Sequence, residues 1–310
     1  MRNGPVVLWR LAQIPYVNLT NAYWSPLARG RQLVPEFAWV RLLGVPIAQA
    51  LFRAFQRVGY MHHAVPINRV RRKHGLPGIG NDFRAALMDG DVTCFADWPE
   101  IVPPAPLPAG QHFIGPVPWS PTVALPPWWE QRVHGVRQRP LVYLTLGSSG
   151  PRNALQEVLD GLTGLPADVI ASTAGPMGGL RVPANVQVAE LLPGDAACAA
   201  ADLVVCNGGS PGTYQALGHG KPVIGVATNM DQFLNMAAVE DVGCGRLVRS
   251  RSATAAVYRR LVPASRWQDS CREHSARRRR SCGDCAAPAD VRRAMHAYRC
   301  PTAVPSNRSP

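Results

Sequence analysis

The sequence predicts an α/β protein with two Rossmann-like units, the N-terminal one incomplete. Residues 140–250 alternate short, continuously apolar runs with helical patterns, which is typical of a parallel sheet covered by helices on both faces. Residues 1–135 combine helical patterns with two short strands, but no strand followed by a glycine-rich turn and a helix precedes residue 60. We therefore expect three segments, 1–135, 136–250 and 251–310, of which the second holds a nearly complete unit.

The elements of the second segment follow from where its apolar runs begin and end. Gly, Pro or Asp bounds each run, and helical patterns lie between most of the runs. The expected strands are 141–147, 168–173, 185–191, 202–207 and 222–227. The expected helices are 153–165, 195–201, 211–217 and 231–242.

The first segment is richer in helical patterns than in strands. Residues 36–60 have apolar side chains at helical spacing and predict one amphipathic helix, or two helices separated at Pro46. Further helices are expected at 67–74 and 82–88, and strands at 93–97 and 112–117. The proline-rich residues 119–129 are typical of a connection between domains.

Length and composition place the chain among globular proteins. It has 310 residues, 46% of them hydrophobic, which excludes a disordered or collagen-like protein. No run approaches the roughly 18 apolar residues of a membrane-spanning helix, and the first residues lack a signal-peptide pattern. The eight cysteines are scattered and predict no disulfide framework, so we expect a cytoplasmic protein with reduced thiols.

The net charge of +13 is concentrated in the last segment. Residues 251–310 hold thirteen arginines and four acids, and the first 250 residues carry a net charge of only +4. The basic residues include just two lysines, a bias that a GC-rich gene also produces, so we expect no nucleic-acid partner. The basic run at 69–74 predicts a solvated helix face, with at most peripheral membrane contact as the alternative.

Residues 206–236 contain the strongest functional signal. A strand ends at Asn207, two glycines allow a tight turn, and Ser210 and Pro211 suit the start of a helix. The amides and positive end of such a helix bind phosphate oxygens. A second loop follows the strand at 141–147 on the same sheet edge, so the two loops together suit a diphosphate. The candidate diphosphate-binding residues are Gly147, Ser148, Asn207, Gly208, Gly209, Ser210, Gly212 and Thr213. The alternative is that this strand–Gly-Gly–helix sequence is a turn without a ligand.

A carboxylate and an amide follow the next strand. Asp231 and Gln232 come directly after the apolar run at 222–227 and are expected at the same sheet edge as the phosphate site. Together they can accept from and donate to adjacent sugar hydroxyls. A phosphate site beside a sugar site indicates a nucleotide sugar.

These motifs resemble those of the UDP-glycosyltransferase superfamily, which has the GT-B fold and includes macrolide, sterol and flavonoid glucosyltransferases. The superfamily pattern joins a His-Gly-Gly-x-Gly-Thr turn, a helix with Glu-Ala-Leu, a Gly-x-Pro strand, and Asp/Glu-Gln followed by Asn. Here it stands as NGGSPGT at 207–213, QAL at 215–217, GKP at 220–222 and DQFLN at 231–235. The resemblance also includes NAYWSP, HFIGPVPW, VYLTLGSSG and LLPGDAACAAADLVV, and it extends over about residues 5–250.

The resemblance implies a fold, a reaction and further site residues. It makes 1–135 a partial acceptor-side domain and 136–250 a nucleotide-sugar donor-binding domain. It implies transfer of a hexose from a nucleotide diphosphate sugar of the UDP or dTDP type to a hydroxyl of a small lipophilic acceptor. Leu191 and Leu192 fall in the segment whose backbone contacts the nucleobase. No metal or other cofactor is implied, because the helix end and backbone amides stabilise the leaving diphosphate.

Three features depart from the superfamily pattern. Asn207 replaces its histidine, so charge-assisted donation to the diphosphate is lost. The opening strand and loop that carry the catalytic histidine have no counterpart, since His62 and His63 follow a helix instead, and the catalytic residue stays unassigned. Residues 251–310 lack the pattern of the long C-terminal helix with which the superfamily fold ends. The chain therefore resembles a glycosyltransferase truncated at both ends, and the alternative function is a non-catalytic remnant that only binds nucleotide.

The last segment has its own alternatives. We expect 251–310 to be a mostly disordered basic tail with at most a frayed helix at 253–261, and a frameshift at about Ser250 would explain its composition. The other interpretation is a small zinc module with a basic nucleic-acid patch beside Arg277–Arg280. Its candidate ligands are Cys271, His274, Cys282 and Cys285.

Overall fold

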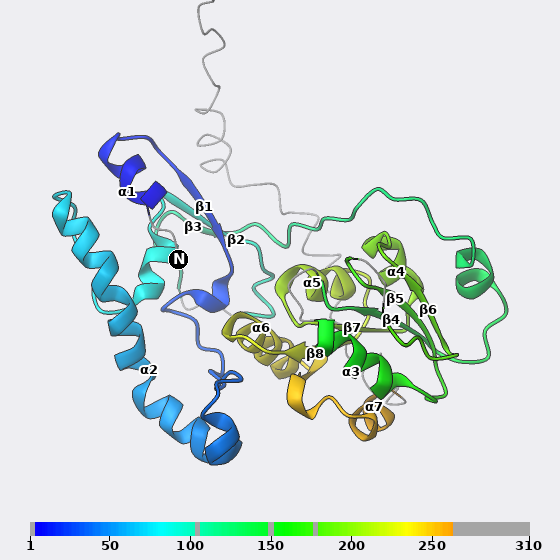
Figure 1. The fold of residues 1–310 in the computed structure, drawn as a ribbon. Coiled ribbons are helices and arrows are strands. Elements are labelled where there is room, and N and C mark those ends of the chain that lie inside the picture. Colours follow the sequence, from blue (N-terminus) through cyan, green and yellow to red (C-terminus); the bar gives the residue numbers. More distant parts are fainter. Residues whose placement is uncertain (1–3, 103–105, 148–151, 176–178, 263–310) are drawn as a thin grey trace, which may run out of the picture.

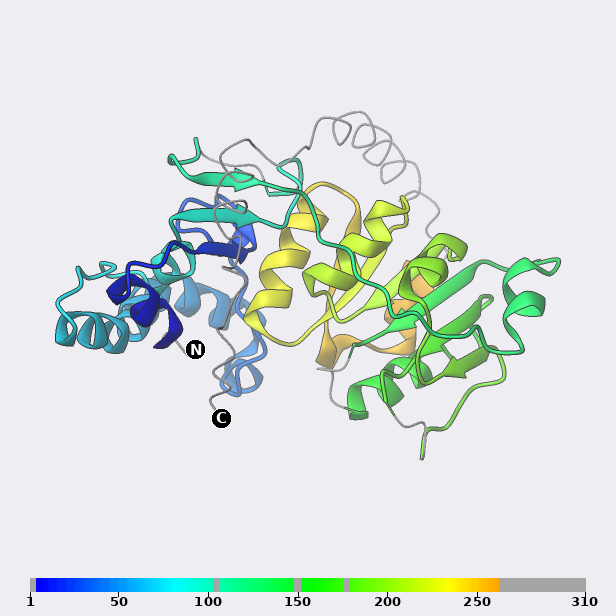
Figure 2. The same cartoon turned by 90° about the horizontal axis from the view of Figure 1, so that it is seen from above.

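The structure, a computed structural model that describes residues 4–102, 106–147, 152–175 and 179–262, contains two α/β units side by side (Figure 1). One unit is built on three parallel strands and the other on six. The connection between them crosses over the second unit before it enters the larger sheet (Figure 2). The predicted α/β class with two Rossmann-like units is confirmed.

The larger sheet has the strand order β6-β5-β4-β7-β8-β9, and all its strands are parallel. The chain builds the first half outward from β4 and then returns to start the second half at β7, so a topological switch point lies between these two strands. The strands are β4 (Leu141–Thr145), β5 (Asp168–Ser172), β6 (Val186–Ala189), β7 (Leu203–Cys206), β8 (Val223–Ala227) and β9 (Gly245–Arg249). Strand β9 was not predicted, because arginines flank its few apolar residues.

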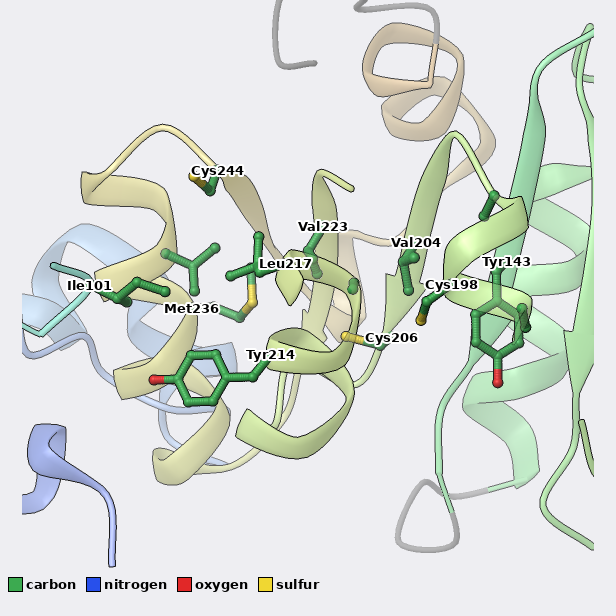
Figure 3. Close-up of a cluster of buried hydrophobic side chains, with 14 of the residues drawn as sticks. Ile101, Tyr143, Cys198, Val204, Cys206, Tyr214, Leu217, Val223, Met236 and Cys244 are labelled. Atoms are coloured by element: carbon green, nitrogen blue, oxygen red, sulfur yellow. The ribbon is translucent and has the colours of Figure 1, made fainter. Parts of the chain in front are cut away.

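Side chains of each central strand alternate between two apolar layers. On β4, Val142 and Leu144 face one layer, and Leu141 and Tyr143 face the other. The first layer is covered by α3 (Arg152–Leu162) and α7 (Ala255–Leu261). The second layer, shown in Figure 3, is covered by α4 (Gly194–Ala200), α5 (Ser210–Gly218) and α6 (Met230–Asp241). The sheet is therefore covered on both faces, as its continuously apolar strands predicted.

The smaller unit has the strand order β1-β2-β3, also parallel. Its elements are α1 (Gly4–Leu11), β1 (Val17–Thr20), the short 3-10 helix η1 (Ala22–Trp24), α2 (Val40–Lys73), the 3-10 helix η2 (Phe83–Met88), β2 (Val92–Phe95) and β3 (Gln111–Phe113). The connection then leads to a π-helical turn, η3 (Glu130–His134). Strand β1, which was not predicted, precedes residue 60, but it leads into η1 and not into the glycine-rich turn and helix whose absence the sequence indicated.

Helix α2 differs from the two or three helices predicted for its residues. The backbone is kinked at Gly44, where φ is 72°, and not at Pro46, which lies in the first turn after the kink. A proline at the start of a helical run costs little, because the amide it lacks has no intrahelical partner there. The helix continues past Pro66, so the separate helix expected at 67–74 is the last part of α2.

The beginning of the expected tail belongs to the core of the second unit. Helix α7 packs on α3, and Tyr258 is fully buried there. A Cβ added to Gly161 of α3 would lie 2.8 Å from the Tyr258 ring, so the two helices meet at a glycine. The segment 253–261 is therefore packed and not frayed. The proposed zinc ligands and the rest of the tail lie outside the described residues.

The contact of Tyr258 with α3 predicts a measurable stability effect. Tyr258→Ala should lower the free energy of unfolding by about 3–5 kcal/mol, the usual cost of truncating a buried aromatic side chain. The Tyr258 hydroxyl is buried without a hydrogen bond to any described residue, so Tyr258→Phe should leave stability unchanged or raise it. Urea unfolding of both variants checks this, and an equal loss in the two would contradict the described packing.

Candidate functional site

The two predicted phosphate loops meet at the switch point between β4 and β7. A Cβ added to Gly147, where φ is 64°, would lie 3.5 Å from Asn207 Nδ2. The turn after β4 and the turn after β7 therefore adjoin at the carboxyl edge of the sheet, where open α/β sheets bind ligands. Ser148 lies outside the described residues.

Two contacts determine the conformation of the turn after β7: a hydrogen bond within the turn, and close packing of the turn backbone against a buried side chain of α6. Asn207 Oδ1 accepts from the Gly209 amide over 3.1 Å. Gly208 has φ of 77°, and a Cβ there would lie 2.7 Å from Met236 Cγ, so only glycine fits. The N-cap of α5 is Gly209 and not Ser210 as predicted, which leaves the Ser210 hydroxyl to donate to Asn21 Oδ1 over 3.3 Å.

The first turn of α5 presents fewer donors than its sequence implied. Thr213 is fully buried, its hydroxyl is near Cys206 Sγ, and its amide donates to the Gly209 carbonyl over 3.1 Å. This arrangement leaves the predicted phosphate contact of Thr213 without a donor. Pro211 has no amide proton, so the amides ahead of Thr213 that a phosphate can use belong to Ser210 and Gly212.

Asp231 and Gln232 have different surroundings although they are neighbours. Gln232 is only 5% exposed, and its Oε1 accepts from the Thr228 amide over 2.8 Å and the Asn229 amide over 3.3 Å. With Asn229 it forms the capping box of α6. Asp231 is half-buried, and its Oδ1 accepts from Trp24 Nε1 over 2.7 Å. Asp231 is therefore the member of the pair that faces the other unit.

A buried carboxylate joins the two units beside this edge. Asp97 is fully buried and accepts from Asn21 Nδ2 over 3.0 Å, from the Ala22 amide, and from the Tyr214 hydroxyl over 2.5 Å. Burial raises the pKa of Asp97 above its usual range, and the hydrogen bonds from Tyr214, Ala22 and Asn21 offset part of that rise. Sequence reasoning missed this group, although the end of strand 93–97 and the NAYWSP motif were both visible.

An apolar cavity of about 590 Å³ lies between α2 and the beginning of α6. Its walls are mostly aromatic and aliphatic side chains: Trp24, Phe37, Trp39, Leu43, Leu51, Phe52, Phe55, Gln56, Gly59, Tyr60, His63, Phe83 and Met230. The Gln56 Oε1 atom is buried without a hydrogen bond to any described residue. His63, which is exposed, lies at the rim of the cavity and packs its ring edgewise on Phe83. The cavity suits a flat apolar ligand with a hydrogen-bond donor.

The two residues predicted to contact the nucleobase differ in exposure. Leu191 is 46% exposed, whereas Leu192 is 2% exposed and packs in the core, so the nucleobase contact stays a prediction. Cys94, Cys198, Cys206 and Cys244 are buried and form no disulfide bond. Within the described ranges, no three His, Cys, Asp or Glu side chains gather as metal ligands. None of the helices described is both long and apolar enough to cross a membrane.

Residues 156–297 match the C-terminal domain of the erythromycin biosynthesis protein CIII-like family. This range includes α5 and α6, which carry most of the candidate site. It also extends to residue 297, which corrects the expected end of the resemblance at about residue 250.

Mycobacterial proteins are similar to most of the chain. A PGL/p-HBAD biosynthesis glycosyltransferase of Mycobacterium tuberculosis is 46% identical over 85% of this chain and 62% of its own length. A PGL/p-HBAD biosynthesis rhamnosyltransferase of Mycobacterium bovis is 49% identical over 78% of this chain and 53% of its own length. An inactive PGL/p-HBAD biosynthesis glycosyltransferase of the same species is 46% identical over 49% of this chain and 41% of its own length. The chain thus spans between 41% and 62% of the length of these relatives.

Solved glycosyltransferase structures share the fold. The calicheamicin glycosyltransferase CalG4 superposes with a TM-score of 0.62 at 16% identity, over 94% of this chain and 70% of that one. The glycosyltransferase VinC in complex with DTDP superposes with a TM-score of 0.55 at 20% identity, over 74% and 59% of the two chains. The GT-B fold that the resemblance implied is confirmed.

The burial of Asp97 predicts a pH-dependent difference between the protein and its Asp97→Asn variant. Because the pKa in the folded state lies above the usual value, the folded protein holds the proton more tightly than the unfolded chain does. The stability that this proton contributes is present at low pH and is lost as the pH rises through the pKa of the folded state. The advantage of wild type over Asp97→Asn in unfolding free energy should therefore shrink from pH 4 upward. Urea titrations between pH 4 and pH 8 measure it, and an advantage that grows with pH would contradict the raised pKa.

Proposed function

We propose that this chain, whose motifs resemble those of the UDP-glycosyltransferase superfamily, belongs to that superfamily and transfers a hexose from a nucleotide diphosphate sugar to a hydroxyl of a small lipophilic acceptor. The observation that carries the proposal is the meeting of three features at one place. Two phosphate-type turns adjoin at the switch point, Asp231 follows on the same sheet edge, and the aromatic cavity begins at Met230, the residue before it. Donor and acceptor can therefore occupy adjoining sites.

The donor side uses backbone groups more than charged side chains. The amides at the start of α5 and the positive end of that helix face developing negative charge on the leaving diphosphate. Asn207 supplies an amide group where the superfamily has histidine, and Gly147 leaves room for a phosphate beside it. In transfer, the acceptor oxygen bonds to the anomeric carbon, the bond from that carbon to the phosphate oxygen breaks, and the hydroxyl proton leaves. No metal or cofactor is part of this proposal.

The names of two similar proteins suggest which donor sugar and which nucleotide to test first. One curated relative is named a rhamnosyltransferase, and one structural neighbour was solved with DTDP. We therefore propose a dTDP-activated 6-deoxyhexose of the rhamnose type as the first donor to test, ahead of a UDP-hexose. Asp231 would accept hydrogen bonds from its hydroxyls, while Gln232, committed to capping α6, contributes by holding that helix start in place.

The acceptor side follows from the chemistry of the cavity. Its walls favour an aromatic or otherwise flat apolar body, and the unsatisfied Gln56 Oε1 favours a ligand that donates one hydrogen bond. A substituted phenol satisfies both conditions. The Tyr60 hydroxyl donates to Gln32 Oε1 over 2.6 Å, whereas Gln56 Oε1 is buried and can accept a hydrogen bond from the ligand.

The second candidate function is nucleotide binding without transfer. It is favoured by the neutral Asn207 in place of histidine and by the relative that is named inactive. Titration with dTDP and UDP tests the donor site in either case, and release of dTDP from a dTDP-hexose in the presence of a phenol separates the two functions. A folded protein that binds no nucleotide at millimolar concentration would contradict both.

The Gly147 position predicts how nucleotide binding responds to added bulk. Gly147→Ala places a methyl group 3.5 Å from Asn207 Nδ2 in the proposed phosphate crevice and should weaken dTDP binding about tenfold, equivalent to about 1.4 kcal/mol. Gly164→Ala is the matched control, because Gly164 also has positive φ and has open space around its Cβ position. Calorimetric titration should show the loss for Gly147→Ala only, and equal affinities in the two variants would exclude the crevice as the phosphate site.

The Gly59 position predicts a separation of stability from acceptor binding. Gly59 lies within α2, lines the cavity, and has no atom within 4 Å of its Cβ position. Gly59→Ala should stabilise the helix by up to about 1 kcal/mol and preserve binding. Gly59→Phe should fold as well but fill the cavity and abolish binding of a 4-alkylphenol, followed by tryptophan fluorescence. Undiminished binding to Gly59→Phe would place the phenol elsewhere.

A further inference from the structure

The carboxylate of Asp231 is held from the smaller unit. Its Oδ1 accepts from Trp24 Nε1 over 2.7 Å and from the Tyr23 hydroxyl over 3.1 Å, and both donors come from η1. The other oxygen, Oδ2, makes no hydrogen bond with any described residue. Hydrogen bonds to a charged acceptor are stronger and more directional than neutral ones, so this pair fixes the plane of the carboxylate. One oxygen is thereby committed, and the other is left to accept from a ligand hydroxyl.

The same Trp24 is also a wall of the aromatic cavity. Its ring packs edgewise on Phe83, another wall residue, with the ring centroids 6.1 Å apart. Met230, which precedes Asp231 at the start of α6, completes the contact between cavity and carboxylate. A ligand in the cavity therefore touches the side chain whose nitrogen orients Asp231.

The pairing of these donors with Asp231 is not an incidental surface contact. Tyr23 is 4% exposed, and burial raises the pKa of its hydroxyl well above the usual range, with the Asp231 charge adding to the rise. Tyr23 therefore remains a hydrogen-bond donor at every pH of interest. The Tyr23 hydroxyl and the Trp24 indole N–H are therefore both available as donors to the Asp231 carboxylate.

We propose that Trp24, assisted by Tyr23, is a positioning residue that couples occupancy of the aromatic cavity to sugar binding at Asp231. The inference rests on the proposed function, because it assigns the cavity to the acceptor and Asp231 to the sugar. A ligand in the cavity packs against the Trp24 indole and fixes its position. The indole N–H then fixes Asp231 Oδ1, so that Asp231 Oδ2 accepts from the sugar hydroxyl in one orientation. By linkage, the sugar must strengthen acceptor binding by the same factor.

Coupling through Trp24 predicts a difference in binding between two ligands that a purely structural role of Trp24 does not predict. dTDP lacks the transferred hexose and so has no hexose hydroxyl to offer Asp231. The affinity for dTDP should therefore not depend on the cavity or on Trp24. The nucleotide sugar should depend on both. Comparing dTDP with dTDP-rhamnose therefore separates orientation of the carboxylate from general stabilisation of the interface.

The experiment measures dissociation constants of dTDP and of a non-transferable dTDP-rhamnose by calorimetry, with and without saturating 4-butylphenol. In this analogue, called dTDP-rhamnose below, a CH2 group replaces the oxygen between the anomeric carbon and the phosphorus, so no transfer occurs during the titration. Wild type should bind dTDP-rhamnose about fivefold to tenfold tighter when the phenol is present, a coupling of about 1 kcal/mol, and should bind dTDP equally in both conditions. Trp24→Phe keeps an aromatic wall but removes the indole donor, so its ratio should fall to about one with dTDP affinity unchanged. Tyr23→Phe, which removes the weaker of the two bonds, should give an intermediate ratio.

Two controls make the outcome decisive. Trp128→Phe is the same substitution outside the cavity, and it should keep the wild-type ratio. Unchanged dTDP affinity in Trp24→Phe and Tyr23→Phe shows that the donor unit is folded. A wild-type ratio in both variants, or an equal effect of phenol on dTDP and dTDP-rhamnose, would overturn the coupling while leaving the proposed function intact. Failure of wild type to bind either nucleotide would overturn the proposed function itself.

Discussion

The close contact of Met236 with the turn after β7 and with the middle of β8 determines the rest of the site. A Cβ on Gly208 would lie 2.7 Å from the Met236 side chain, and one on Gly225 would lie 2.4 Å from it, so α6 approaches β7 and β8 at a distance that only glycine permits. In the same contact the buried Asn235 Nδ2 donates to the Gly208 carbonyl over 2.8 Å. Because Asp231 lies on the first turn of that helix, its position relative to the turn after β7 follows from this packing.

Polar side chains, and not an apolar surface alone, join the two units at this point. Asp97 tolerates full burial because three donors from both units satisfy it, and any sliding of one unit along the other would leave a buried carboxylate unpaired. The ion pair of Arg249 with Glu36 and the Trp24 bond to Asp231 add contacts of the same kind. The smaller unit thus contributes the apolar walls of the cavity and also the groups that hold the polar residues of the larger unit.

The second unit could be predicted almost element by element, because each of its elements carries a local signal. Apolar runs end at glycines and prolines, and the turn at Gly208 is visible without any knowledge of packing. The first unit could not. Strand β1 has the sequence VNLT with little apolar pattern, and α2 runs through Pro66 although proline ordinarily predicts a break. Tertiary contacts override local preference in both cases.

The sequence by itself determined the turn chemistry of the candidate donor site and the carboxylate that follows it, because glycine torsions, capping and helix ends depend on residues a few positions apart. It also indicated that Asp231 and Gln232 would lie at the same sheet edge as the phosphate-type turns. Only the tertiary structure decided that Asp231 accepts from the Trp24 donor 207 positions away. Contacts between residues so distant leave no spacing pattern in a single sequence, since they arise only when two separately formed units pack against each other.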